Sequence, residues 1–306
     1  MAAIECRHVY KKYGNVQALR DVNFEVRSRI CLGFLGPNGA GKTTAIRILA
    51  GLARPTGGEI SVAGVDVIRN PQRVKPLIGY LAQTPAFYNW MTAEEYLMFC
   101  AELFKLNYKE AKLRSAELLE RTGLTGAARR KIGGFSGGMK QRLGIAQALI
   151  NRPKVVFLDE PVSALDPIGR HEVLEIIREL KRETTVFFST HVLNDADIIC
   201  DEVIILKEGK VLAQAPIEEL RGKYAAPVFE LDLDVFPPQL LEKLGQAAWY
   251  SSHQVAGSLL TVVVNNVAEA KVELPRLLVA EGAELRRYQV QTPNLEQVFL
   301  QVVGGK

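Results

Sequence analysis

The segment from Ile30 to about Pro55 restricts the possible folds more than any other part of the chain. Here the apolar run ICLGFLG leads into Gly36-Pro-Asn-Gly-Ala-Gly-Lys-Thr, and TTAIRILAGLARP then shows helical spacing. A buried strand, a glycine-rich loop with the spacing GxxxxGK[ST] and a helix, in this order, are typical of a phosphate-binding turn. The sequence therefore predicts an α/β fold with an anion site at the start of the helix.

Each part of this loop has a predicted role. Glycines let the backbone curl so that successive N–H groups face the β- and γ-phosphates, Lys42 adds a positive charge, and the Thr43 hydroxyl is placed to bind magnesium. The alternative, a glycine-rich turn with a surface lysine, does not explain the strand before the loop and the helix after it. The predicted nucleotide-binding residues here are Gly36, Pro37, Asn38, Gly39, Ala40, Gly41, Lys42, Thr43 and Thr44.

A second predicted strand ends in two acids, in Lys154-Val-Val-Phe-Leu-Asp159-Glu160. Ligands of parallel sheets bind at the carboxyl ends of the strands. We therefore expect Asp159 to bind Mg²⁺, directly or through water, and Glu160, which points the other way, to accept a proton from an attacking water. An acidic strand end alone is as often a helix cap or turn, so this interpretation depends on the phosphate loop.

Periodicity outlines two domains in the 306 residues. Residues 4–29 alternate in two runs, 57–67 form a predicted hairpin, 85–133 have helical spacing, and helices starting at Met139 then alternate with strands as in a largely parallel sheet. Beyond Leu220 the order strand, helix, strand, strand, helix, strand, with the second helix expected from Lys271 and with a closing helix, fits a small ferredoxin-like α+β module. We expect a domain at 1–220, with a helical subdomain at about 85–150, and an accessory domain at 221–306.

Composition argues against several classes of protein. The 38 basic and 34 acidic side chains are interspersed and give a formal net charge of +4, so no nucleic-acid partner is indicated. The four cysteines are far apart and form no CxxC pair, which argues against a zinc knuckle or a disulfide framework and suits a reducing cytosol. No apolar run approaches the roughly 18 residues that cross a bilayer, and no signal-peptide core is present. The chain is expected to be soluble or peripheral.

The stretch Phe135-Ser-Gly-Gly-Met-Lys-Gln-Arg142, shortly before the acidic pair, resembles the signature motif of ABC ATPases. Ser136, Gly137 and Gly138, which precede a predicted helix, offer a hydroxyl, free N–H groups and a positive helix end to an anion. The commonest family form is LSGGQ; here Phe135 and Met139 replace the first and last residues, so the usual terminal amide is absent. The resemblance covers residues 2–220 and implies an ABC ATPase domain with ATP as its substrate and Mg²⁺ as its cofactor.

The resemblance also implies roles for three single residues. Tyr13 resembles the aromatic that stacks on adenine, Gln83 the glutamine that reaches magnesium and water, and His191 the switch histidine that contacts the γ-phosphate and holds Glu160. Each has a plainer alternative: strand-end packing for Tyr13, a solvated amide for Gln83, and a buried structural imidazole for His191. The predicted catalytic residues are Glu160, His191 and Lys42, and the predicted metal ligands are Thr43, Gln83 and Asp159.

Two segments correspond to interfaces in the family. Ser163-Ala-Leu-Asp166 resembles the loop that crosses the dimer interface, although Asp166 before Pro167 is equally consistent with a turn and helix cap. The aromatic stretch Phe87-Tyr-Asn-Trp-Met91 lies where the family receives a permease, and ordinary packing is the alternative. In the family, two copies bind ATP head to tail, each signature capping the ATP of the other copy.

The stretch Thr292-Pro-Asn-Leu-Glu-Gln-Val-Phe-Leu resembles the tail of ATPases in ABC-2 type exporters of drugs, antibiotics, sodium or polysaccharides, and SGGMKQR is frequent in that subgroup. The resemblance implies an exporter subunit at the cytoplasmic face of the cell membrane, in a homodimer or heterodimer with a related ATPase and bound to a separate transmembrane permease. The alternative is a soluble ABC ATPase of translation or DNA repair. Such proteins usually have tandem ATPase domains or a long coiled coil, whereas this chain has one phosphate loop and no sustained heptads.

Overall fold

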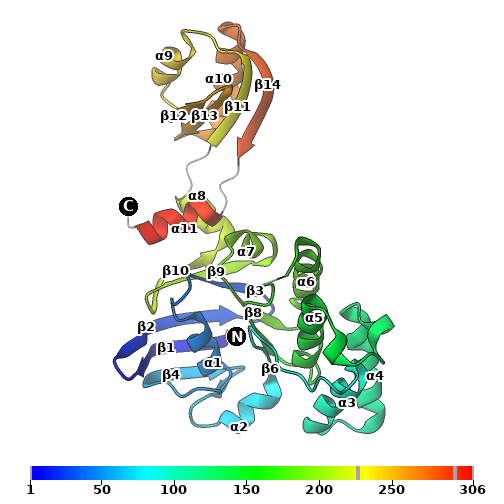
Figure 1. Cartoon of the computed structure of the whole chain (residues 1–306). Helices are drawn as coiled ribbons and strands as arrows, with labels where there is room; N and C mark the ends of the chain where they lie inside the picture. Colours follow the sequence, from blue (N-terminus) through cyan, green and yellow to red (C-terminus); the bar gives the residue numbers. More distant parts are fainter. Residues whose placement is uncertain (1, 164, 225–227, 292–294, 305–306) are drawn as a thin grey trace. The chain divides into compact units, whose positions relative to one another are not determined.

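The computed structural model describes residues 2–163, 165–224, 228–291 and 295–304, which divide into two compact units, Met1–Ile217 and Glu218–Lys306 (Figure 1). Clusters of buried apolar side chains lie within each unit. Among the described residues, no helix combines the length and the apolar character that crossing a membrane requires.

The larger unit is built around a six-stranded sheet with buried central strands. Its order is β10 (Lys210–Pro216), β9 (Glu202–Lys207), β3 (Cys31–Leu35), β8 (Thr185–Thr190), β7 (Val155–Asp159) and β6 (Ile78–Leu81). Strands β6, β7, β8, β3 and β9 pair in parallel, and only β10 is antiparallel to its neighbour. Both faces of this sheet are covered, one by helices and the other by α1 (Lys42–Leu49) and a second sheet, which is why β3, β7 and β8 are buried throughout.

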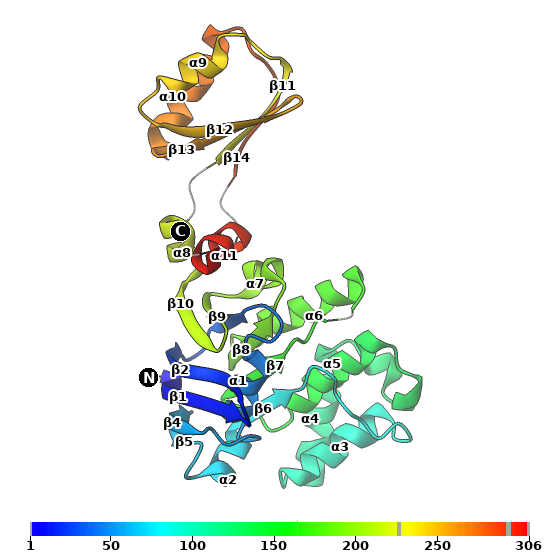
Figure 2. The same ribbon diagram turned by 60° about the vertical axis from the view of Figure 1, so that its left-hand side comes forward.

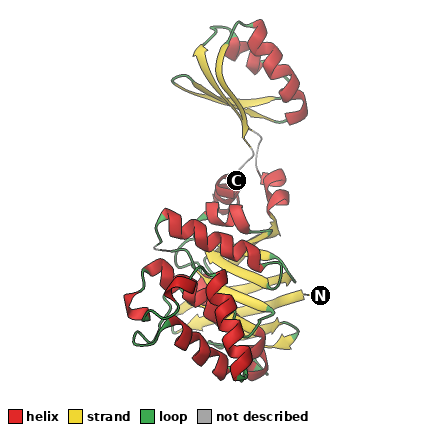
Figure 3. Ribbon diagram, turned by 90° about the vertical axis from the view of Figure 1, so that its right-hand side faces the viewer, coloured by secondary structure: helices red, strands yellow, loops and turns green. Residues whose placement is uncertain are grey.

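Alternate residues of the sheet face two different layers. Phe157 and Phe187 pack with this second, antiparallel sheet and with α1, whereas Leu158 and Phe188 pack with the helices on the opposite face. The second sheet has the order β2 (Val16–Arg27), β1 (Ala2–Tyr13), β4 (Gly57–Val62) and β5 (Val65–Asp66). Figure 3 shows the helices lying across the strands of this unit. The expected α/β class, with an antiparallel N-terminal part and a mixed core, is confirmed.

The helices of the larger unit begin at cap residues. In α3 (Ala93–Leu103), Thr92 and Glu95 form a capping box, in which the Glu95 N–H donates to Thr92 Oγ1 at 3.2 Å and the Thr92 N–H to Glu95 Oε2 at 2.8 Å. Asn107 caps the next helix with its side chain, because its Oδ1 accepts from the Glu110 N–H at 3.0 Å. The remaining α-helices of this unit are α2 (Pro71–Val74), α4 (Tyr108–Arg121), α5 (Gly137–Ala148), α6 (Pro167–Leu180) and α7 (Leu193–Ile199). Helix α8 (Ile217–Tyr224) starts at the last residue of this unit and otherwise belongs to the smaller unit.

The smaller unit contains the predicted ferredoxin-like module. Its chain order is β11 (Val228–Val235), α9 (Leu240–Gly245), β12 (Tyr250–Ala256), β13 (Leu259–Val264), α10 (Val267–Ala280), β14 (Glu284–Gln291) and α11 (Leu295–Gly304). The antiparallel sheet has the order β12-β13-β11-β14, and α9 and α10 lie on one face of it (Figure 2). Helix α10 starts at Val267, earlier than the pattern from Lys271 predicts, because Asn266 caps it by accepting from the Glu269 N–H. Residues 292–294 of the exporter-like tail lie outside the described residues.

Candidate functional site

The phosphate loop has a backbone that only glycine fits at two positions. A Cβ on Gly36 would lie 2.3 Å from the Leu206 carbonyl oxygen, and one on Gly41 would lie 2.6 Å from the Ala18 oxygen. Gly41 also has a φ of 108°, in the left-handed region. Helix α1 begins at the next residue, Lys42, so its free N–H groups point into the loop. Close packing against β2 and β9 therefore fixes the curl that the motif predicts.

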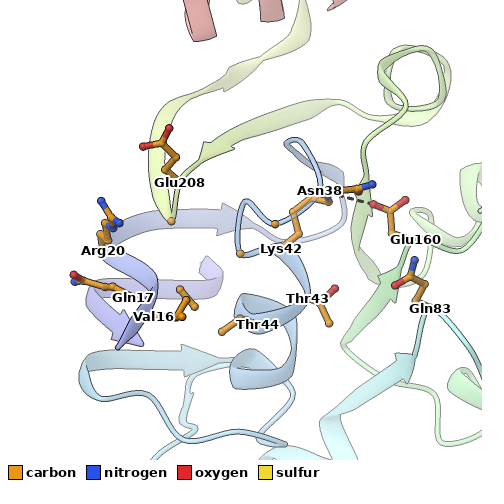
Figure 4. A pocket seen from close by; sticks show the side chains of 14 residues that line it. Val16, Gln17, Arg20, Asn38, Lys42, Thr43, Thr44, Gln83, Glu160 and Glu208 are labelled. Atoms are coloured by element: carbon orange, nitrogen blue, oxygen red, sulfur yellow. Dashed lines mark ion pairs between the residues drawn. The ribbon is translucent and has the colours of Figure 1, made fainter. Parts of the chain in front are cut away.

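Lys42 connects this loop to the acidic strand end. Its Nζ donates to the carbonyl oxygens of Gly36 and Pro37 at 2.7 and 3.2 Å and lies 3.3 Å from Glu160 Oε1 (Figure 4). The side chains of Lys42 and Glu160 are each only 6% exposed. Because both charges are buried, each stabilises the other, and the sheet brings together two residues that are far apart in sequence.

Glu160 has an unusual backbone that separates it from Asp159. Its φ is 49°, in the left-handed region, and its N–H donates to the Ser189 carbonyl oxygen and to Ser189 Oγ at 3.2 and 3.0 Å. This turn breaks away from β7, so the adjacent carboxylates have different partners. Glu160 Oε2 lies 2.8 Å from Nδ1 of His191, whose side chain is 43% exposed. The structure thus brings together the three predicted catalytic residues, Lys42, Glu160 and His191.

Asp159 lies on the opposite side of this strand end. Its Oδ1 accepts from Ser189 Oγ at 2.7 Å and from Thr43 Oγ1 at 3.3 Å, while Oδ2 is buried without a partner among the described residues. Burial raises the pKa of this carboxyl, and the hydrogen bonds from Ser189 and Thr43 lower it in part. An unpartnered buried oxygen beside a threonine hydroxyl fits Mg²⁺, which takes one or two protein oxygens and keeps water and phosphate ligands.

A cavity of about 570 Å³ contains most of the loop and its surroundings (Figure 4). Gln83, from the loop after β6, lines it together with Lys42, Thr43 and Glu160. The full lining is Val16, Gln17, Ala18, Arg20, Asn38, Gly39, Gly41, Lys42, Thr43, Thr44, Gln83, Glu160, Glu208 and Gly209. Of the predicted residues, six of the phosphate loop line this cavity together with Gln83 and Glu160, whereas Gly36, Pro37, Ala40, Asp159 and His191 are not part of its lining.

This cavity is also lined by residues that the motifs did not indicate. Val16, Gln17 and Arg20 come from the start of β2, and Glu208 comes from the turn between β9 and β10. The Arg20 N–H donates to the Gly209 oxygen at 2.7 Å, which fixes that turn beside the loop. Only the packing of a hairpin against the phosphate loop makes these residues part of the site, and no sequence pattern marks them.

Tyr13 lies outside this lining. It ends β1, is 47% exposed, and has Lys11 Nζ 4.4 Å from its ring centre. An exposed ring near the cavity-lining start of β2 is accessible to a planar base. Its role in stacking on adenine stays a prediction.

The signature residues also lie outside this lining. Ser136 caps α5 by accepting from the Met139 N–H at 3.2 Å, so the helix begins at Gly137, two residues earlier than the apolar pattern predicts. Ser136 and Gly137 are exposed, and a Cβ on Gly137 would meet nothing within 4 Å. The signature end of α5 is therefore open to a molecule from outside the chain, while the phosphate loop and the signature do not line one cavity.

The two predicted interface segments have distinct local structures. Asp166 caps α6 by accepting from the Gly169 N–H at 3.3 Å, as the cap interpretation requires; Ala164 lies outside the described residues. In the aromatic stretch, Phe87 packs edge-on against Tyr96 with ring centres 5.2 Å apart, whereas Tyr88 and Trp90 are 51% and 67% exposed. Tyr88 also packs edge-on against Phe99, with ring centres 5.8 Å apart, and Trp90 lies beside Tyr88 at 6.0 Å. Packing therefore accounts for Phe87 and in part for Tyr88, and it leaves most of the Trp90 ring exposed.

Comparison with known proteins bears on both units. Residues 19–163 match the ABC transporter family, and residues 216–303 match the C-terminal domain of DrrA1-3-like ATP-binding proteins. The chain is 42% identical to the uncharacterized ABC transporter ATP-binding protein YxlF of Bacillus subtilis, with 96% of this chain and 97% of that protein covered. It is 34% identical to the bacitracin transport ATP-binding protein BcrA of Bacillus licheniformis, with 99% and 97% covered.

Solved structures agree with this assignment. An ATP-binding subunit of an ABC transporter superposes with a TM-score of 0.66 at 32% identity, covering 72% of this chain and 93% of that one. The ATP-binding cassette MJ0796, in a dimeric post-hydrolysis state bound to ADP and phosphate, superposes with a TM-score of 0.64 at 27% identity, covering 70% and 98%. With the loop, the acidic strand end and these matches together, the chain belongs to the family of ABC transporter ATP-binding proteins and is an ATPase.

Proposed function

We propose that this chain powers an exporter by closing with a second ATPase domain on ATP and driving a separate transmembrane permease. The observation that carries the proposal is the position of Glu160 at the phosphate loop, within ion-pair distance of Lys42 and hydrogen-bond distance of His191. Relatives matching nearly the whole chain include ATP-binding proteins of bacitracin transport, daunorubicin resistance and Nod factor export, which supports export rather than another role.

In the proposed reaction, Lys42 and the loop N–H groups bind the β- and γ-phosphates, and Glu160 accepts the proton of the attacking water. His191 Nδ1, at 2.8 Å from Glu160 Oε2, orients that carboxylate. The other ring nitrogen, Nε2, then contacts the γ-phosphate. Thr43, Asp159 and Gln83 would hold Mg²⁺, which supplies neutralisation of phosphate charge when bound. The N–H groups at the start of α5 of a second copy, or of a related ATPase, at Gly137 and Gly138, complete the site.

The surface for the permease is proposed at the exposed aromatics Tyr88 and Trp90. They follow the loop of Gln83, so a partner bound there would touch the segment that reaches the cavity. In this arrangement the chain is peripheral to the cytoplasmic face of the membrane. Exposed aromatic rings of this kind are enriched at protein interfaces.

The test is purification of the full chain from detergent-solubilised membranes of its native cells, followed by mass spectrometry of whatever co-purifies. A stoichiometric protein with many membrane spans supports the proposal and identifies the permease. A Trp90→Ala, Tyr88→Ala double variant should lose that partner but keep its ATP affinity. Recovery of ribosomal or DNA-bound partners instead would favour the soluble ABC ATPase of translation or repair.

A further inference from the structure

Asp195 is a buried carboxylate near the site that the reaction described above does not use. It lies in the first turn of α7, is 1% exposed, and its Oδ1 lies 2.7 Å from Arg170 Nε and 2.6 Å from Arg170 Nη2. Its Oδ2 has no hydrogen-bond partner in the part of the chain that the structure describes. An ion pair that holds a fully buried carboxylate is often no more stabilising than apolar packing, so stability alone does not explain it.

Arg170 joins Asp195 to helix α6, which follows Glu160 in the sequence. It lies in the first turn of α6, where its N–H donates to the Asp166 oxygen at 2.9 Å. The chain before α6 is tied to Glu160, because the N–H and the hydroxyl of Ser163 both donate to the Glu160 carbonyl oxygen, at 3.1 and 2.9 Å. Ser163, which these bonds hold against the main chain of Glu160, lies four residues before the first residue of α6.

The side chain of Glu160 contacts His191, which lies just before helix α7. His191, at 2.8 Å from Glu160 Oε2, immediately precedes the turn that opens α7, and Asp195 follows four residues later. Helices α6 and α7 pack side by side (Figures 1 and 2). Glu160 is therefore linked to Ser163, shortly before α6, and to His191, shortly before α7, while the Arg170–Asp195 ion pair joins the first turns of these two helices.

We propose that the Arg170–Asp195 ion pair is a positioning pair, which sets the His191–Glu160 distance by fixing the first turn of α7 against the first turn of α6. The electrostatics agree with this connection. Besides burial, which raises the pKa of Asp195, and Arg170, which lowers it, the charge of Glu160 raises that pKa and His191 lowers it. The charges of Glu160 and His191 therefore act on the Asp195 carboxyl through space.

The same two helices provide a matched control. Lys181, the C-cap residue of α6, donates to Asp201 Oδ1 at 2.7 Å just after the end of α7. The side chains of Lys181 and Arg170 are equally exposed, at 33%. Two ion pairs thus join these segments, one at the starts of the helices and one at their far ends. Asp195 is 1% exposed and Asp201 is 37% exposed, so a purely structural role predicts a larger loss of stability for the Arg170 pair, whereas a positioning role predicts a fall in kcat at temperatures where every variant is fully folded.

The experiment compares Arg170→Gln, Arg170→Lys and Lys181→Gln in the full chain, assembled as it is when the parent hydrolyses ATP. We expect Arg170→Gln to lower kcat about tenfold with KM for ATP within about twofold, because misplacement of a catalytic group affects the transition state more than substrate binding. Arg170→Lys should restore part of the rate, and Lys181→Gln should match the parent. Adding Asp195→Asn to Arg170→Gln should cause no further loss, since both remove one interaction.

Equal losses in Arg170→Gln and Lys181→Gln, a change in KM alone, or a parent rate in Arg170→Gln would each overturn the positioning role. The inference rests on hydrolysis at the Lys42–Glu160 site. A parent chain without ATPase activity would overturn that function and this inference together, whereas an active parent with an unaffected Arg170→Gln variant overturns the inference only.

Discussion

Lys42 Nζ lies 3.3 Å from Glu160 Oε1, and both side chains are almost completely buried. The cation of the phosphate loop and the carboxylate of the proposed base are therefore one ion pair. Because a buried charge without a partner is costly, replacing either residue affects the stability of the protein as well as its chemistry. Replacing Glu160 removes the proposed base, whereas replacing Lys42 leaves the Glu160 carboxylate without its buried cation, so the two replacements separate the effect on chemistry from the effect on stability.

Replacing Glu160 with Gln should stop hydrolysis and leave ATP binding intact. The amide retains the volume and can still accept from His191, but it cannot take a proton, so we expect kcat to fall by about 10²-fold or more. Light scattering should then detect a dimer that persists with ATP, since ATP stabilises the closed form and is not consumed. The control is Glu179→Gln on the exposed face of α6, which should match the parent rate. A Glu160→Gln variant that hydrolyses ATP at the parent rate, or stays monomeric with ATP, contradicts the role of Glu160.

Replacing Lys42 with Met should abolish ATP binding and also lower the free energy of unfolding. We expect a loss of about 1–3 kcal/mol, because Glu160 keeps His191 as a partner but loses its buried cation. Adding Glu160→Gln should recover part of this loss, which urea unfolding of the four proteins in the cycle would measure. Strict additivity of the two losses would mean that the ion pair contributes nothing to stability. Lys112→Met, on the exposed surface of α4, is the control.

A negative charge at Gly137 should block the second phosphate site without damaging the fold. The position is exposed, a Cβ there meets nothing within 4 Å, and an acidic side chain in the first turn suits the dipole of α5. We expect Gly137→Asp to fold with an unchanged thermal midpoint and to bind ATP as a monomer. It should lose ATP-dependent dimerisation and most of its hydrolysis, by repulsion of the γ-phosphate held on the other copy. Parent-like dimerisation would argue against a head-to-tail arrangement.

The difference in stability between the Asp195→Asn variant and the parent should change with pH in a defined direction. Burial raises the pKa of the Asp195 carboxyl above its usual value of 3.8, so the folded protein binds this proton more tightly than the unfolded chain. The contribution of Asp195 to the free energy of unfolding therefore falls as pH rises from about 4 through the folded-state pKa. Asn has no such proton, and we expect the stability of the variant relative to the parent to increase between pH 4 and pH 7. Urea unfolding at several pH values measures this difference, and parallel profiles would contradict it.

The local motifs predicted the centre of the site, because the loop and the acids are each contiguous in sequence. Ser189 was missed. It donates to Asp159 and accepts from the Glu160 N–H, yet this role follows from the pairing of β7 with β8, which places Asp159 opposite Ser189. Its position two residues before His191 at a strand end is the one sequence signal that pointed to it.

The rest of the cavity could not be predicted from local patterns. Arg20 and Glu208 reach it only because two antiparallel hairpin elements pack on the phosphate loop, and that packing depends on the whole core. Helix starts were misplaced for a simpler reason. Helices α5 and α10 begin at the residues that follow their caps, Ser136 and Asn266, and not at the first residue of the apolar pattern.

The separate apolar clusters of the two units have a consequence for heating experiments. The cluster around Phe229, Leu260 and Leu274 is made only of residues from the smaller unit, and the clusters around Phe157 and Phe188 only of residues from the larger one. A calorimeter should therefore record two heat-absorption peaks, since each unit can melt cooperatively on its own. A nucleotide bound at the phosphate loop should move one peak upward and leave the other in place, so a single melting temperature does not describe this molecule.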